Sequence, residues 1–278
     1  MKTRFVTPAG DAEVFLRIVE ETETSGTVRP ERFKKMMREN RGIVQFFSPF
    51  QPPEDHLERK NPVIVALGDS VTAGHFEFTG DPVQLFAKAD VGLLGEGDAI
   101  EITDVRECYL EKFREKLIDY YEQTSVSVIN CGIAGDTMLG MEKRLERDVI
   151  RYQPDLVIIN GSLNWGKECG TTEDYKKVLE SVADRILENT EADMILLTPN
   201  MEIPGPFTAS HSFLEDRVEI IRAMAEEKKV CLADAYAAWK NYEAAGYPVG
   251  ALLANGINHP SVTGHEAYAE ILMKLVRS

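Results

Sequence analysis

The sequence has few cysteines, no long apolar run and no clustered basic patch, and each absence narrows the possible functions. The four cysteines of this 278-residue chain stand far apart and form no C-x-x-C pair, which disfavours a zinc or redox site and favours free thiols. The longest apolar runs, such as residues 63–67, have the length of a strand and are too short to span a bilayer. We therefore expect no metal, no cofactor and no membrane segment.

The chain is acidic, with a formal net charge of −15. A negative surface repels phosphate backbones, which argues against a nucleic-acid partner. The N-terminal stretch, residues 1–13, turns acidic and contains proline and glycine before any apolar block, unlike a secretory signal. These features predict a cytoplasmic protein that acts on a small molecule, and they leave the oligomeric state open.

From residue 62 onward, short apolar runs alternate with amphipathic stretches. Such runs lack polar alternation and so predict strands buried on both faces, as in a parallel sheet covered by helices. The expected fold class is α/β, a three-layer α/β/α sandwich with a five-stranded parallel sheet. The predicted strands are 63–68, 125–130, 155–161, 193–199 and 230–235. The predicted helices include 109–123, 171–189, 212–229 and the C-terminal stretch.

Residues 1–60 differ in character and predict an N-terminal helical extension packed on a main domain of residues 61–278. Helical patterns cover about 11–22 and 30–40, the second opened by Pro30. The connector that follows is rich in proline and aromatic residues. Its phenylalanines are expected to pack onto the main domain or, alternatively, to line the substrate cleft; they are Phe46, Phe47 and Phe50. A second stretch, 75–104, is expected to be irregular.

Polar residues stand at the predicted carboxyl ends of the strands, where open α/β sheets bind ligands. Ser70 ends the first apolar run, Gly135 lies in a tight loop after the second, and Asn164 follows the third. His259 precedes the last helix. A serine, a histidine, a glycine amide and an asparagine amide are the groups that acyl transfer requires.

Four short blocks in this order resemble those of the SGNH hydrolase superfamily, the GDSL-type esterases and lipases. The blocks are Gly68-Asp69-Ser70-Val71, Gly135-Asp136-Thr137, Asn164 and His259-Pro260. The resemblance covers residues 62 to the C-terminus and implies a flavodoxin-like fold and hydrolysis of esters or thioesters. The serine stands in no G-x-S-x-G sequence, which argues against the ordinary α/β-hydrolase nucleophile turn.

The resemblance assigns a role to each block. Ser70 would attack the acyl carbonyl while His259 takes its proton. The oxyanion would be held by the amides of Ser70 and Gly135 and by the side chain of Asn164. His75, five residues after Ser70, is a second-choice base, and Asp69 is expected to be structural. For the remaining histidines the sequence offers no partner: they are His56, His211 and His265.

The sequence departs from the family pattern at two places. Trp165 follows Asn164 where the family usually has an aspartate, and it either lines the substrate pocket or packs beneath the loop. The aspartate that usually stands three residues before the histidine is replaced by Gly256, with Asn255 before it. We expect Asn255 or a main-chain oxygen to orient the histidine ring, and Asn255→Asp to raise the hydrolysis rate.

The sequence thus predicts a carboxylic ester hydrolase that cleaves short acyl groups, such as acetyl, from a carbohydrate or another small molecule. The alternative is a degenerate protein of the same fold that binds an acylated or carbohydrate ligand without turnover, because the aspartate is missing. A nucleotide-binding flavodoxin-like module is disfavoured by the lack of a glycine-rich phosphate loop.

Overall fold

A central parallel sheet organises the computed structural model, which describes residues 9–39, 61–93, 95, 100–122, 125–205, 208 and 213–278. The sheet has five strands in the order β4-β1-β5-β6-β7, and all pairings are parallel. Its strands are β1 (Val63–Gly68), β4 (Ser127–Gly132), β5 (Leu156–Asn160), β6 (Asp193–Leu197) and β7 (Cys231–Ala233). The expected α/β sandwich is confirmed, with strand ends shifted by up to two residues.

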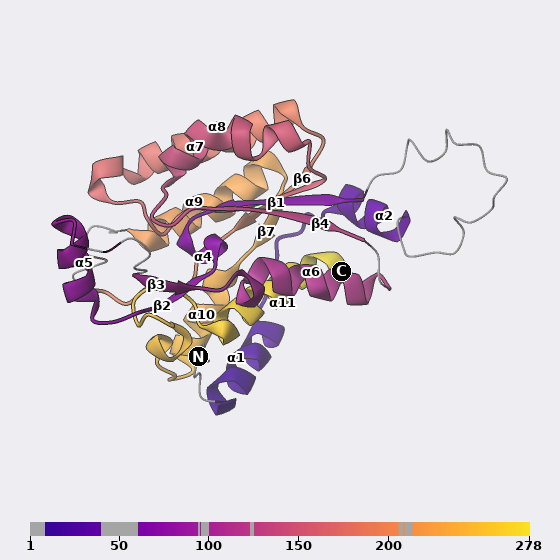
Figure 1. The fold of residues 1–278 in the computed structure, drawn as a ribbon. Coiled ribbons are helices and arrows are strands. Elements are labelled where there is room, and N and C mark those ends of the chain that lie inside the picture. Colours follow the sequence, from indigo (N-terminus) through magenta and orange to yellow (C-terminus); the bar gives the residue numbers. More distant parts are fainter. Residues whose placement is uncertain are drawn as a thin grey trace.

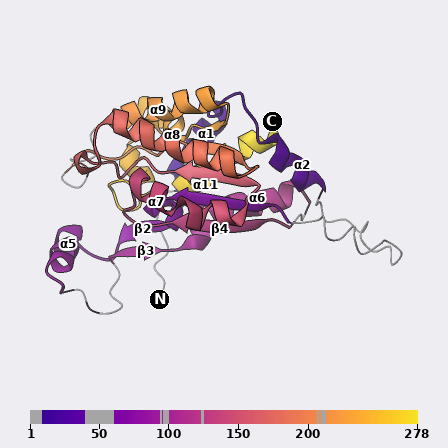
Figure 2. The same cartoon turned by 90° about the horizontal axis from the view of Figure 1, so that it is seen from above.

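Helices cover both faces of this sheet, as Figures 1 and 2 show. One face carries α7 (Met138–Asp148), α8 (Thr172–Asn189) and α9 (Leu214–Lys228). The other carries α6 (Tyr109–Tyr120), α10 (Ala235–Ala244) and α11 (Val262–Arg277). A hydrophobic core lies on each face of the sheet, and alternate residues of β1 point into one or the other. Ile64 packs with α6 and α11, and Val65 packs with α7 and α8. Burial on both faces explains why the strand sequences are continuously apolar.

The N-terminal segment lies against the sheet edge and the helices of the second face. Helix α1 (Ala9–Glu21) contacts α10 and α11, and its Phe15 meets Trp239 edge-on with ring centroids 4.7 Å apart. Ser25 forms an antiparallel bridge with Ala233 of β7. Helix α2 (Glu31–Glu39) follows and packs near β6. The aromatic connector with Phe46, Phe47 and Phe50 lies outside the described residues.

A small antiparallel pair of strands, not expected from the sequence, occupies part of 75–104. Strand β2 (His75–Phe78) pairs with β3 (Glu101–Thr103), and α5 (Pro82–Asp90) lies between them in the chain. The strands are short, their register is irregular, and more than twenty residues separate them, so no local hairpin signal exists in the sequence. The pair lies beside α4 (Ser70–Ala73) at the carboxyl end of β1 (Figure 1).

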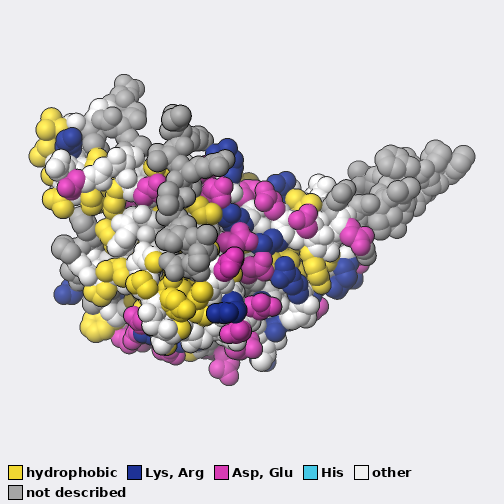
Figure 3. All heavy atoms as spheres, turned by 90° about the horizontal axis from the view of Figure 1, so that it is seen from below, with side chains coloured by type: hydrophobic (Ala, Val, Ile, Leu, Met, Phe, Trp, Pro, Cys, Tyr) yellow, Lys and Arg dark blue, Asp and Glu magenta, His cyan; other side chains and the backbone are white. Residues whose placement is uncertain are grey.

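Charged side chains of both signs are interspersed on the face that Figure 3 shows. On neighbouring helices, Lys116 of α6 lies 2.7 Å from Glu270 of α11, an ion pair that joins the two. No helix among the described residues has both the length and the apolar character needed to cross a membrane.

Candidate active site

Ser70 lies where β1 turns directly into α4. Asp69 caps the helix, its carboxylate accepting the Val71 N–H at 3.0 Å, and this buried carboxyl has its pKa raised to about 6 by desolvation. A Cβ on Gly68 would lie 2.9 Å from the Asn160 carbonyl and closer still to Thr72, so only glycine fits the turn. The tight turn places Ser70, 5% exposed, at the bottom of a cleft.

His259 lies opposite Ser70, and its Nε2 is 2.9 Å from the serine Oγ. The histidine comes from the loop before α11, 189 residues further along the chain. That loop is fixed by a Leu253–Pro260 bridge and by the Ala254 N–H, which donates to the His259 carbonyl at 2.8 Å. The structure therefore brings together the two residues that the sequence pairs as nucleophile and base.

All three predicted oxyanion donors line the same cleft, which has a volume of about 730 Å³. Gly135 has φ +71°, a backbone conformation that favours glycine, and the space where a Cβ would stand is open, with nothing within 4 Å. The Asn164 amide donates to the Asp136 carbonyl at 3.1 Å, which ties the loop after β5 to the Gly135 turn. Ser70, Gly135 and Asn164 thus all line the cleft.

A buried arginine of α7 holds the strand ends beneath this cleft. Arg144 donates to the main-chain carbonyls of Gly68 at 2.9 Å and Cys131 at 2.7 Å. Its Nε also donates to the Asp136 carboxylate at 2.6 Å. One guanidinium therefore connects β1, β4 and the turn that carries Gly135, and it ties the turn before Ser70 to that of Gly135.

The second ring nitrogen of His259 faces two oxygens of the β2–β3 pair. Nδ1 lies 3.1 Å from the Phe76 carbonyl and 3.1 Å from Oε1 of Glu101. The other carboxylate oxygen of Glu101 lies 3.0 Å from Nδ1 of His75. Desolvation favours a raised pKa for Glu101, but its contacts with His259 and His75 outweigh this and lower the pKa to about 2. Glu101 is therefore an anion at neutral pH.

The model of the GDSL-like lipase/acylhydrolase family matches residues 66–267 of this chain. The chain belongs to that family. The predicted SGNH relationship is confirmed, and so is the expectation of a carboxylic ester hydrolase.

Individual relatives of this GDSL-family chain agree with that membership. An acetylxylan esterase from Geobacillus stearothermophilus is 28% identical over 166 residues, 55% of this chain and 74% of the relative. Its crystal structure superposes with a TM-score of 0.57 at 26% identity, covering 77% of this chain and 94% of the esterase. Two solved mutants of that esterase, one of an aspartate and one of a serine, are described as catalytic mutants. An alpha/beta hydrolase from the metagenome of Lake Arreo, Spain, shares the fold, with 23% identity, a TM-score of 0.58 and coverage of 78% and 95%.

The expectation for Asn255 in this GDSL-family hydrolase needs correction. Its Oδ1 accepts the backbone N–H groups of Ile257, Asn258 and His259 at 2.9–3.0 Å, while its Nδ2 donates to the Asn258 side chain. Asn255 thus closes a turn and supports the histidine through its backbone, not through its ring. The main-chain oxygen that the sequence left as the other alternative is present, as the Phe76 carbonyl, and Glu101 accompanies it.

Trp165 does not line the cleft of this hydrolase. Its side chain is 3% exposed, packs edge-on against Tyr175 and donates to the carbonyls of Gly170 and Thr171 at 3.2 Å. The packing alternative is therefore correct and the pocket alternative wrong, because the indole N–H finds its partners in the loop before α8. His75, by contrast, does line the cleft.

His265 makes no contact with Ser70 and does not line the cleft. His265 is buried in α11, where its Nδ1 accepts the Tyr109 N–H at 3.2 Å, and burial lowers its pKa to about 3. It is a neutral packing residue with the partner that the sequence could not supply. His56 and His211 lie outside the described residues.

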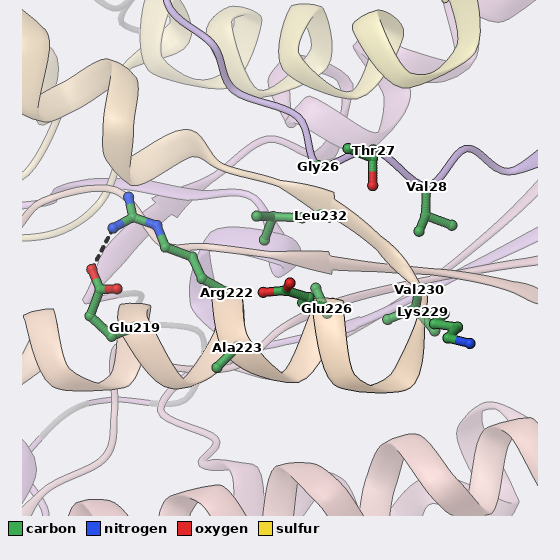
Figure 4. A pocket seen from close by; sticks show the side chains of 11 residues that line it. Gly26, Thr27, Val28, Glu219, Arg222, Ala223, Glu226, Lys229, Val230 and Leu232 are labelled. Atoms are coloured by element: carbon green, nitrogen blue, oxygen red, sulfur yellow. Dashed lines mark hydrogen bonds and ion pairs between the residues drawn. The ribbon is translucent and has the colours of Figure 1, made fainter.

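A second pocket, of about 570 Å³, lies between β7 and α9 (Figure 4). Arg222 and Glu219 form an ion pair of 2.6 Å across its wall, and its lining residues include no serine, histidine or cysteine. Among the described residues, no group of three or more histidine, cysteine, aspartate or glutamate side chains has the arrangement of a metal site. The paired serine and histidine thus distinguish the first cleft.

Proposed function

We propose that this chain hydrolyses short acyl esters, acetyl esters of carbohydrates among them, with Ser70 as nucleophile and His259 as general base. The observation that carries the proposal is the 2.9 Å contact between Ser70 Oγ and His259 Nε2 at the bottom of an open cleft. The similarity to an acetylxylan esterase supports acetyl as the acyl group and a sugar as the alcohol.

The proposed reaction proceeds in two stages. Ser70 Oγ forms a bond to the acyl carbon while its proton passes to His259 Nε2, and His259 then gives that proton to the departing alcohol. In the second stage a water molecule loses a proton to His259 and attacks the acyl carbon of the acyl-serine ester. The bond between that carbon and Ser70 Oγ then breaks, His259 returns the proton to Oγ, and the acid is released. In both stages the negative oxygen would accept hydrogen bonds from the amides of Ser70 and Gly135 and from Asn164.

The lining of the cleft supports a small substrate with one apolar and one polar side. Apolar side chains come from the β2–β3 pair and its neighbours: Phe78, Phe86 and Ile100. Amide side chains come from the loop after β5 and from the loop before α11: Asn164, Asn255 and Asn258. An acyl methyl group suits the first set, and sugar hydroxyls suit the second.

The alternative of a binding protein without turnover depended on the absent aspartate. The carboxylate of Glu101 does lie at the histidine ring, so the missing aspartate no longer argues for a loss of catalytic activity.

A fluorophosphonate probe tests the proposal, together with release of acetate from p-nitrophenyl acetate and from acetylated xylo-oligosaccharides. We expect covalent labelling and turnover in the wild type, loss of both in Ser70→Ala, and no change in Ser127→Ala, an exposed serine of β4. A wild-type protein that is neither labelled nor active on any ester would contradict the proposal and favour the binding alternative.

A further inference from the structure

We infer that Glu101 is the positioning carboxylate of His259, supplied by β3 in place of the aspartate that the family pattern puts three residues before the histidine. This inference rests on the proposed function of Ser70 and His259. It differs from the family pattern because the acid comes from a separate element, the β2–β3 pair, and not from the loop that carries the histidine.

The contacts of the ring fix its tautomer. Nδ1 of His259 faces a carbonyl oxygen, that of Phe76, and a carboxylate oxygen of Glu101, each 3.1 Å away. Neither oxygen can donate a hydrogen at neutral pH, so Nδ1 must carry the hydrogen. Nε2 then presents a lone pair to the hydroxyl of Ser70, 2.9 Å away, which is the protonation state that a general base requires.

The carboxylate provides what the carbonyl cannot. Both acceptors orient the ring, but only Glu101 carries a full negative charge, and His259 becomes a cation when it takes the proton of Ser70. The side chains of Glu101 and His259 are 16% and 6% exposed, so water screens their interaction weakly. The carboxylate therefore stabilises the charge that develops on the ring during both stages of the reaction.

His75 holds this carboxylate in place. It contacts the second oxygen of Glu101 at 3.0 Å, while its ring centroid lies 6.1 Å from that of His259. One carboxylate thus bridges two histidines. The antiparallel pairing of His75 with Thr103 holds β2 and β3 together, and these strands carry His75 and Glu101. Glu101 cannot swing away from His259 without breaking its contact with His75.

No other described carboxylate takes this place at the ring. Asp69 adjoins Ser70, but its carboxylate accepts the Val71 N–H, and the Asp136 carboxylate pairs with Arg144. Asn255 is occupied by three backbone N–H groups of its own turn. The described charged or titratable groups that interact with His259 are Glu101 and His75 from the β2–β3 pair, Asp69 from the end of β1, and His265 from α11.

The test compares Glu101→Gln with Glu77→Gln, a matched control that removes a carboxylate from β2 outside the cleft lining. We expect Glu101→Gln to lower kcat about 100-fold with KM nearly unchanged, which is less than the roughly 10⁴-fold loss of a serine protease whose acid is neutralised, because the Phe76 carbonyl still orients the ring. Glu77→Gln should match the wild type.

The pH profile separates a charge effect from a structural one. Without the carboxylate the protonated ring is less favoured, so the acid limb of kcat/KM against pH should move to lower pH in Glu101→Gln. Because His75 also contacts Glu101, the profile is repeated in the His75→Gln background, where the same displacement should persist. An unchanged kcat and an unchanged acid limb in Glu101→Gln would overturn the inference.

A measurement on the wild type covers the case in which Glu101→Gln fails to fold. The Nδ1–H proton of His259 should give a strongly downfield proton NMR signal that is absent from His259→Gln; absence of such a signal in the wild type overturns the inference. If the wild type turns over substrate, Ser70→Ala abolishes this turnover and Glu101→Gln is fully active, only the role of Glu101 is refuted and the proposed function stands. A wild type without esterase activity would refute the proposed function instead.

Discussion

Gly132, the last residue of β4, has no room for a side chain, and its replacement should displace Ser70, the proposed nucleophile. A Cβ at this position would lie 2.2 Å from the Ala73 nitrogen and 2.6 Å from the Thr72 carbonyl carbon. Both atoms belong to the backbone of α4, the helix that begins with Ser70. A side chain tip could rotate away, but backbone atoms can separate only if the whole helix moves.

The displacement can be estimated from these distances. Ordinary contact of a Cβ begins at 3.4 Å, so the gap of 2.2 Å must widen by 3.4 − 2.2, about 1.2 Å. Overpacking of this kind costs roughly 1–3 kcal/mol of stability. A shift of about 1 Å at a reacting group lowers the rate roughly 100-fold. The hydrogen bond between Ser70 and His259 is the contact that this shift would stretch.

The assay is kcat/KM on p-nitrophenyl acetate together with the melting temperature of Gly132→Ala. We expect activity to fall about 100-fold and the melting temperature to fall by a few degrees, about 2–4 °C per kcal/mol in a domain of this size. Gly250→Ala is the matched control, since a Cβ there meets nothing within 4 Å and the residue has no positive φ. If Gly132→Ala keeps wild-type activity and melting temperature, the close approach of β4 to α4 does not position Ser70.

Three further predictions concern the cleft. Asn164→Ala should lower kcat by about 10²–10³ through loss of an oxyanion donor, with KM little changed; equal kcat values would remove Asn164 from the oxyanion site. Asn255→Asp should not raise kcat/KM, contrary to the sequence-based prediction, because the side chain meets backbone N–H groups and not the ring; a tenfold rise would show otherwise. The pKa of Glu101 is lowered from 4.5 to about 2, so its ionisation stabilises the folded state above about pH 4.5, and this contribution is lost as the pH falls towards 2. The difference in melting temperature between wild type and Glu101→Gln should therefore shrink over that interval, and a constant difference would contradict the shift.

Much of the fold followed from the sequence because its signals are local. Each strand of the parallel sheet is a short apolar run, and its predicted limits lie within two residues of the observed ones. The motif residues Ser70, Gly135, Asn164 and His259 could be placed near one another because parallel strands end at one edge. Ser70, Gly135 and Asn164 meet in one cleft through this topology, whereas His259 reaches it from the loop before α11.

The partner of the histidine ring could not be found in this way. Glu101 lies in a three-residue strand whose pairing with β2 involves residues more than twenty positions apart, so nothing in the local sequence distinguishes it from the other glutamates of the chain. Asn255 was the natural candidate by its place before His259, yet the turn itself uses its side chain. Trp165 shows the same limit, since burial of an indole depends on the loop that folds over it.

The short β-bridge between Ser25 and Ala233 has a practical consequence for N-terminal truncation of this protein. Backbone groups along the outer edge of β7 and just after it pair with Thr24, Ser25 and Gly26, and Phe15 packs edge-on against Trp239. The family match begins only at residue 66, so a shortened chain starting near residue 61 would look like the whole catalytic unit. It would instead expose the unpaired edge of β7, and exposed strand edges promote aggregation by pairing with strands of other molecules. Insolubility of such a chain would therefore say nothing about its catalytic residues.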